Sequence, residues 1–266
     1  YFYRSFMQNL VNNFNIKNYL DLIKINKGDK ILLSSDILKI LIKFREKNNV
    51  LDPNTIIDLL IEKIGEDGTL LVPTYNWDFC KGADFHYYKT KAQSGSLGNI
   101  CLKRKDFKRS KNPIYSFAVF GKDQKKICEL KHNSCFSLDS PFGYLIENKG
   151  INIFIGIDYK EAFTFDHVAE EVAQVEYRYF KKFKGVYLDK FEKKKIETYK
   201  MYVRKLNLVK STKIDQSFDD ILIKNNIYEK KIYNDIPLSS IDIYKSYEIM
   251  LKDIRTQRQY IYPEII

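Results

Sequence analysis

Residues 28–42 read Gly-Asp-Lys-Ile-Leu-Leu-Ser-Ser-Asp-Ile-Leu-Lys-Ile-Leu-Ile, and this stretch predicts the fold class. The apolar run after Lys30 has the length of a buried strand, and the Gly28-Asp29 pair before it is a turn signal. Small polar residues at 34–36 then lead into residues 37–42, which have helical character. A strand, a polar turn and a helix in this order are typical of a layered α/β protein.

The same order recurs further along the chain. The patterns predict helices over residues 54–64 and from 165 to about 180, and strands over 69–72, 115–120 and 151–157. Alternating buried strands and helices predict an α/β fold, with a layered α/β/α core built on a mixed sheet.

The character of the sequence changes near residue 185. Shorter strand and helix signals follow, mixed with many tyrosines and lysines. We therefore expect residues 1–185 to form the α/β core that carries the functional site. Residues 186–266 are expected to form a smaller C-terminal α+β subdomain, which packs on the core because no low-complexity linker precedes it.

Composition limits the class of protein. The chain has 266 residues, of which 44% are hydrophobic and 30% charged, so it is globular. No window is long and apolar enough for a membrane span, and the first ten residues lack the apolar core of a signal peptide. The four cysteines form no Cys-x-x-Cys pair and no zinc-ligand spacing with the histidines. We expect reduced thiols, a cytoplasmic location and no metal.

The formal net charge of +11 predicts attraction to anions. Nucleic acid, phosphorylated cofactors and nucleotide-linked sugars all qualify. Lysine clusters such as 103–111 and 181–195 are spread along the chain, and solvated surfaces explain each of them equally well. A noncatalytic nucleic-acid-binding module is the alternative from another class, although no known nucleic-acid-binding motif is apparent.

Residues 164–170, Thr-Phe-Asp-His-Val-Ala-Glu, contain the candidate catalytic histidine. His167 lies at the start of a predicted amphipathic helix, where the helix dipole disfavours imidazolium and keeps the ring able to accept a proton. Glu170 and Glu171 lie three and four residues on, so one of them shares its helical face and orients the ring. A polar helix start with a capping histidine is the alternative.

Several stretches together resemble the aminoglycoside 3-N-acetyltransferase family, also called the antibiotic N-acetyltransferase family. No single stretch is specific, but their order and spacing make the resemblance strong. The matching pieces are residues 28–35, 68–75, 95–97, 109–118, 140–143 and 153–156, and the Thr164-x-x-His167-x-x-Glu170 signature. They cover roughly residues 28–180.

The resemblance implies direct transfer of an acetyl group from acetyl-CoA to a sugar amine in a ternary complex. In that reaction His167 is the general base and Glu170 orients it. Such a base is needed because an ammonium has no lone pair until it loses a proton, and a positioned base contributes about 10²–10⁴-fold to the rate.

The resemblance also implies where acetyl-CoA binds, and the aromatic residues of the chain indicate where the acceptor binds. Acetyl-CoA is expected along the strand ends, near five hydroxyl residues: Ser34, Ser35, Thr74, Ser110 and Ser116. Each of these also fits an ordinary turn or capping role. The acceptor is expected beside the long aromatic loop over residues 76–96, with Tyr75, Trp77 and Asp78 as its contacts.

Two positions depart from the family pattern. Relatives commonly have His-Ser-Ser after the first strand, where this chain has Leu33-Ser34-Ser35. They also commonly have Arg-Ser-x-His-Pro, where Asn112 here precedes Pro113. These departures concern coenzyme binding more than the catalytic signature, which is intact.

The charge of the chain bears on the acceptor. An aminoglycoside is a polycation, whereas the chain carries +11 and its 77–93 loop has only Asp78 and Asp84 as acidic residues. We therefore expect a nucleotide-linked amino sugar of surface-polysaccharide synthesis, with an aminoglycoside antibiotic as the alternative. The expected partner is this small molecule and not nucleic acid, and a homodimer is compatible with the sequence.

Overall fold

The computed structural model of the chain describes residues 14–256 and 259–266. At its centre is a seven-stranded sheet with the strand order β10-β11-β6-β1-β2-β5-β4. Its strands are β1 (Lys30–Ser35), β2 (Thr69–Pro73), β4 (Lys108–Arg109), β5 (Phe117–Gly121), β6 (Ile151–Ile155), β10 (Tyr228–Tyr233) and β11 (Ile236–Asp242). β1 pairs in parallel with β2 and β6, and the other pairs are antiparallel. The carboxyl ends of these three central strands therefore lie at one edge.

Helices cover both faces of this mixed sheet. Because side chains alternate along a strand, Ile31 and Leu33 pack into one hydrophobic core and Leu32 into the other. The first core is closed by α2 (Ile16–Leu20), α3 (Leu38–Arg45), α4 (Asn54–Ile64) and α5 (Ser96–Cys101). The second is closed by α6 (Gln124–Glu129), α7 (Pro141–Glu147), α8 (Phe165–Ala173), α9 (Gln216–Lys224) and α10 (Ile243–Thr256). The predicted layered α/β/α architecture is confirmed.

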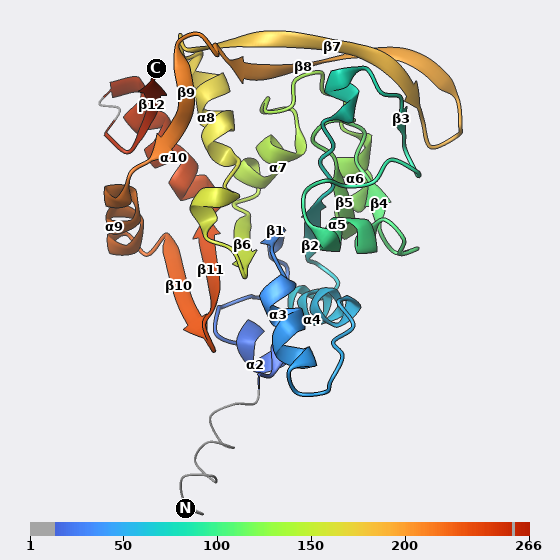
Figure 1. Cartoon of the computed structure of the whole chain (residues 1–266), viewed down its shortest axis with the longest axis vertical. Helices are drawn as coiled ribbons and strands as arrows, with labels where there is room; N and C mark the ends of the chain where they lie inside the picture. Colours follow the sequence, from blue (N-terminus) through green and yellow to red (C-terminus); the bar gives the residue numbers. More distant parts are fainter. Residues whose placement is uncertain (1–13, 257–258) are drawn as a thin grey trace, which may run out of the picture.

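Two smaller sheets join segments that are far apart in the sequence. One has the order β3-β7-β8, from β3 (Phe85–His86), β7 (Arg178–Leu188) and β8 (Lys194–Arg204). The long β7–β8 hairpin runs from the end of α8 across the molecule to β3 (Figure 1). The other pairs β9 (Val209–Ile214) with β12 (Ile261–Ile265).

The division between residues 185 and 186 stays a prediction. β7 runs across this boundary, and β10 and β11, which follow it, extend the central sheet beside β6. The residues after 185 therefore share the sheet that carries the strand ends.

Most predicted elements are present with small shifts, and two predicted helices extend further than the structure shows. The helix over 54–64 and the strand after Lys30 are as expected. The helix that contains His167 ends at Ala173 and not near 180, because Gln174 adopts a left-handed conformation with φ +53°. Apolar residues at helical spacing over 10–25 also predict an amphipathic helix. The structure has the shorter helix α2 there, and residues 10–13 of the predicted range lie outside the described residues. No helix within 14–256 or 259–266 has the length and apolarity to cross a bilayer.

Candidate active site

His167 is held at the first turn of α8. Phe165, Val168 and Ala169 are fully buried and anchor the helix against the core, so the histidine projects from the remaining side. Its side chain is 29% exposed. The Phe136 ring packs against the imidazole edge-on, with ring centroids 5.2 Å apart. This arrangement leaves the ring anchored but reachable.

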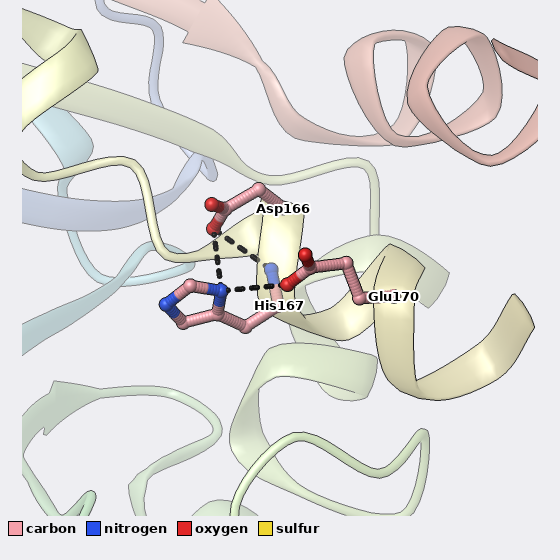
Figure 2. Close-up of side chains that lie close together, drawn as sticks. All are labelled: Asp166, His167 and Glu170. Atoms are coloured by element: carbon pink, nitrogen blue, oxygen red, sulfur yellow. Dashed lines mark hydrogen bonds and ion pairs between the residues drawn. The ribbon is translucent and has the colours of Figure 1, made fainter. Parts of the chain in front are cut away.

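Glu170, and not Glu171, contacts the imidazole. Oε2 of Glu170 lies 3.0 Å from Nδ1 of His167, and Oδ1 of Asp166 lies 3.3 Å from the same nitrogen (Figure 2). Because two carboxylates face Nδ1, we assign the ring proton to this nitrogen, which then donates to them. The Nε2 lone pair is then free to accept a proton, which is the tautomer that a general base needs.

Glu170 is fully buried and surrounded by donors. Its Oε1 accepts hydrogen bonds from the hydroxyls of Tyr177 and Thr212, each at 2.9 Å. Its Oε2 lies 2.8 Å from Nε of Arg178. Burial opposes ionisation, but the His167 contact, the Arg178 charge and the Tyr177 hydrogen bond outweigh it and lower the pKa of Glu170. The residue is therefore a buried carboxylate at neutral pH.

Arg178 begins β7 and is itself 7% exposed. One terminal nitrogen donates to the Tyr202 carbonyl and the other to Oγ1 of Thr212, both at 3.1 Å. Nε forms an ion pair with Glu170 but is not aligned for a hydrogen bond. The second terminal nitrogen also lies 3.2 Å from Nδ1 of His167. Because Nδ1 donates to carboxylates, we interpret this as a charge contact.

Sequence reasoning missed Arg178, Tyr177 and Thr212. Arg178 lies 11 residues beyond His167 and Thr212 lies 42 beyond Glu170. These contacts arise because the chain leaves α8 after Ala173 and strands β7 and β9 fold back on the helix. The helical pattern of the sequence does not predict this reversal.

The other two acidic residues of α8 are buried differently. Burial raises the pKa of Asp166, against the opposing effect of His167. Burial also raises the pKa of Glu171, whose carboxylate accepts a 2.7 Å hydrogen bond from Ser134. Glu171 is thus turned away from the imidazole, toward the loop before α7.

Asp166, His167 and Glu170 bring three potential ligand atoms within 4.8 Å of one another. A cation placed there would meet the Arg178 guanidinium, which is 2.8 Å from one ligand oxygen and 3.2 Å from the ring nitrogen. That positive charge disfavours a metal ion at this position. The donor set suits a charge-balanced base better than a metal centre.

Two of the predicted coenzyme residues meet at the end of β2. The hydroxyls of Thr74 and Ser116 lie 2.8 Å apart, and both are buried. Arg109 joins them: Nε donates to Oγ of Ser116 at 2.9 Å and a terminal nitrogen to the Thr74 carbonyl at 3.1 Å. The other terminal nitrogen donates to the carbonyls of Tyr87 and Thr90, in the aromatic loop. Arg109 is a second arginine that sequence reasoning did not single out.

The remaining hydroxyl residues are separate from that cluster. Ser110 accepts the Phe117 amide hydrogen at 2.9 Å, and Ser34 accepts from the Asn152 side chain at 3.2 Å. Ser35 ends β1 and is half-buried. Its carbonyl would lie 3.1 Å from a Cβ placed on Gly95, so the turn before α5 is close to this strand end. The role of all five residues in coenzyme binding stays a prediction.

The predicted acceptor residues are placed along a series of aromatic rings. Tyr75 is buried and its side chain hydrogen-bonds that of Thr164, the residue before α8, while burial raises its pKa. Trp77 packs edge-on against Tyr115 at 6.3 Å, and Tyr115 packs on Phe136 at 4.7 Å. Because Phe136 touches His167, the rings connect the loop with the imidazole.

Asp78 lies apart from these rings. Its carboxylate accepts from Gln93 at 2.8 Å and pairs with Lys81 at 3.4 Å. Contact of Tyr75, Trp77 and Asp78 with an acceptor stays a prediction.

A family model described as "Aminoglycoside 3-N-acetyltransferase" matches residues 46–238. The match spans β2, α8 with its His–Glu pair, and most of the sheet. The chain belongs to the aminoglycoside 3-N-acetyltransferase family. The resemblance on which the sequence prediction depended is thereby confirmed, and with it the assignment to a family of N-acetyltransferases.

Individual relatives of this family are distant in sequence. The SPbeta prophage-derived aminoglycoside N(3')-acetyltransferase-like protein YokD of Bacillus subtilis (strain 168) is 26% identical over 139 residues. That alignment covers 43% of this chain and 50% of YokD, so the chain matches about half the length of this curated relative.

Solved structures of the family share the fold over nearly the whole chain. The YokD crystal structure has a TM-score of 0.70 at 17% identity and covers 92% of this chain and 93% of its own. Aminoglycoside acetyltransferase AAC(3)-Xa has a TM-score of 0.73 at 18% identity, covering 90% and 91%. AAC-IIIb, described as a binary complex with CoASH, has a TM-score of 0.69 at 15% identity, covering 89% and 93%.

Proposed function

We propose that this protein transfers an acetyl group from acetyl-CoA to an amine of an aminoglycoside-type amino sugar, acting in the cytoplasm as a small-molecule enzyme. The observation that carries the proposal is the contact between the partly exposed His167 ring and the fully buried Glu170, at 3.0 Å. A neutral imidazole with a free Nε2 is the group that amine acylation requires. Family membership and a neighbour described as bound to CoASH support the donor.

The reaction consumes one acceptor ammonium and one thioester. His167 takes a proton from the ammonium or from the attacking nitrogen, so that a nitrogen lone pair attacks the thioester carbonyl carbon. A C–N bond forms, the C–S bond breaks as the tetrahedral adduct collapses, and the departing sulfur takes up a proton to give CoA thiol. One proton is released overall. Glu170 stabilises the imidazolium that forms while the proton is held.

The comparisons support one of the two classes of acceptor over the other. The nucleotide-linked amino sugar suggested by net charge finds no support among the relatives, and the aminoglycoside alternative is favoured. Net charge is a poor guide here because it sums the whole surface, whereas the site contains its own carboxylates. Asp166 and Glu170 both face the imidazole of His167, at 3.3 and 3.0 Å.

The deciding experiment measures release of thiol from acetyl-CoA with two sets of acceptors. One set is kanamycin-like aminoglycosides and the other is nucleotide-linked amino sugars. We expect turnover with the first set. Turnover with the second set alone would replace the acceptor but keep the chemistry, and no turnover with any amine would contradict the proposal.

A matched pair of variants ties the turnover to the site. His167→Gln is expected to lower kcat by about 10²–10⁴-fold, the usual contribution of a positioned base. His86→Gln is the control, because His86 pairs with Leu188 at the far end of β7, ten residues from Arg178 and so roughly 30 Å along the strand. Equal loss in both variants would contradict the role of His167.

A further inference from the structure

Arg178 places a positive charge beside the two carboxylates that face the His167 imidazole. Two carboxylates of α8, those of Asp166 and Glu170, face Nδ1 of His167 at 3.3 and 3.0 Å. Left alone, such a pair favours imidazolium, the form that cannot accept a proton. Among the described residues in contact with the ring, Arg178 is the positively charged one, and it lies 2.8 Å from Glu170 and 3.2 Å from Nδ1.

Hydrogen bonds and burial hold the Arg178 guanidinium in one position. Its side chain is 6% exposed, and its terminal nitrogens donate to the Tyr202 carbonyl on β8 and to Thr212 on β9. The Thr212 hydroxyl in turn donates a hydrogen bond to Glu170 at 2.9 Å. Three strands therefore fix the guanidinium and the carboxylate relative to each other. Phe136, which also packs against the imidazole, carries no charge.

We propose that Arg178 is a positioning residue for acetyl transfer: its guanidinium balances the buried Glu170 carboxylate, so that His167 stays neutral with its proton on Nδ1 and Nε2 free. This inference rests on the proposed function. The side-chain contacts of Arg178 are with Glu170 and His167 and with the strands that hold it, so it acts through the carboxylate and the ring.

The first test uses the unmodified protein. Nitrogen-15 NMR of the histidine side chains distinguishes the two neutral tautomers, and only three histidines are present, with His167 assigned by its absence in His167→Gln. We expect a neutral ring at pH 7.5 with the proton on Nδ1. A neutral ring with the proton on Nε2, or an imidazolium at that pH, overturns the proposal.

The second test removes the charge. In Arg178→Gln the Glu170 carboxylate is no longer balanced, so the imidazolium form of His167 is favoured and the acidic limb of the kcat/KM profile should move to higher pH. kcat/KM should fall most at the acidic end of the profile, by up to about tenfold, and approach the wild-type value as the pH is raised, because the neutral ring is restored. Arg178→Lys keeps the positive charge, so the His167 titration and the pH profile of this variant should match those of the wild type.

Arg204→Gln is the matched control. Arg204 lies opposite Arg178 in the β7–β8 pairing, but its side chain donates to the Lys210 carbonyl and, among the described residues, has no recorded contact with Asp166, His167 or Glu170. A wild-type titration in Arg178→Gln, or an equal shift in Arg204→Gln, contradicts the proposal. If Arg178→Gln does not fold, the titration of Arg178→Lys and the tautomer of the wild type decide it. These NMR readings do not depend on turnover, so they remain valid if the proposed reaction fails.

Discussion

Thr212 donates its hydroxyl hydrogen to Glu170 at 2.9 Å and connects β9 with the carboxylate that orients the imidazole. The two residues are 42 positions apart, on opposite sides of the predicted boundary at 185. The hydroxyl also accepts from Arg178 at 3.1 Å. A residue of the C-terminal stretch therefore completes the hydrogen bonding of a site that sequence reasoning assigned to residues 1–185.

Replacing Thr212 with valine should weaken both stability and turnover. The change keeps the shape but leaves Oε1 of Glu170 with one donor fewer and an Arg178 nitrogen without that acceptor. A buried polar group that loses its partner costs about 1–3 kcal/mol, which urea denaturation would measure. We expect kcat to fall about tenfold, which corresponds to about 1.4 kcal/mol in the barrier.

Ser211→Ala is the neighbouring control for Thr212→Val. The Ser211 hydroxyl donates to Glu264 at 2.6 Å, away from Glu170. A change of this kind near the surface should stay within about 0.5 kcal/mol and leave kcat unaltered. If the two variants lose activity equally, the hydroxyl of Thr212 has no specific role in the site.

Glu171 should make stability depend on pH in the direction opposite to an ordinary surface carboxylate. Burial raises the pKa of Glu171 in the folded protein, so the folded state binds the proton more tightly than the unfolded chain does. Its contribution is then fully present at low pH and is lost as the pH rises through the folded pKa. Glu171→Gln should gain on the wild type as the pH rises from 4 to 8, by about 2–4 °C in Tm if the difference is about 1 kcal/mol.

Glu264→Gln provides a control of opposite sign for the same thermal scans. A hydrogen bond from Ser211 leads the interactions that lower the pKa of Glu264, so its contribution is present above the unfolded pKa and is lost as the pH falls. The prediction is contradicted if the Tm of Glu171→Gln minus the Tm of the wild type falls as the pH rises from 4 to 8. The Glu171 carboxylate would then be stabilised by its surroundings.

The strands and helices of the core could be predicted because their signals are local. The apolar run after Lys30 and the spacing over residues 54–64 each depend on side chains within one element. The end of α8 could not, because Gln174 carries the left-handed turn that glycine usually provides. After it, β7 pairs with β8 residue by residue, and this pairing overrides the helical pattern.

The sequence predicted the contacts of the site that lie within one helix, but not those between elements. His167 and Glu170 are one helical turn apart, so their contact follows from α8 alone. Arg178 reaches them only because β7 folds back on the helix, a tertiary contact without a periodic signal. Ser110 was assigned to coenzyme from the family pattern, whereas its hydroxyl accepts a backbone hydrogen bond. A short polar residue fits both roles, so its identity does not distinguish them.

We expect Arg109 to hold the aromatic loop, residues 76–96, against the end of β2. It is 2% exposed, stacks over the Phe85 ring at 4.7 Å, and donates to the carbonyls of Thr74, Tyr87 and Thr90. Burial lowers its pKa to about 10, so it remains a cation at neutral pH. In Arg109→Lys the planar fork is lost and buried carbonyls lose their donors, which should cost about 2–4 kcal/mol of unfolding free energy.

Urea denaturation measures that cost, and limited proteolysis should cut the variant faster within residues 76–96, because the loop is no longer held. Arg104→Lys is the control, since Arg104 pairs with Asp58 and Asp106 on the other face of the sheet with 20% of its side chain exposed. Ion pairs of this kind contribute about 0–1 kcal/mol. If both arginine variants lose the same stability, or if proteolysis of the loop is unchanged in Arg109→Lys, then Arg109 fills space in the core without holding the loop.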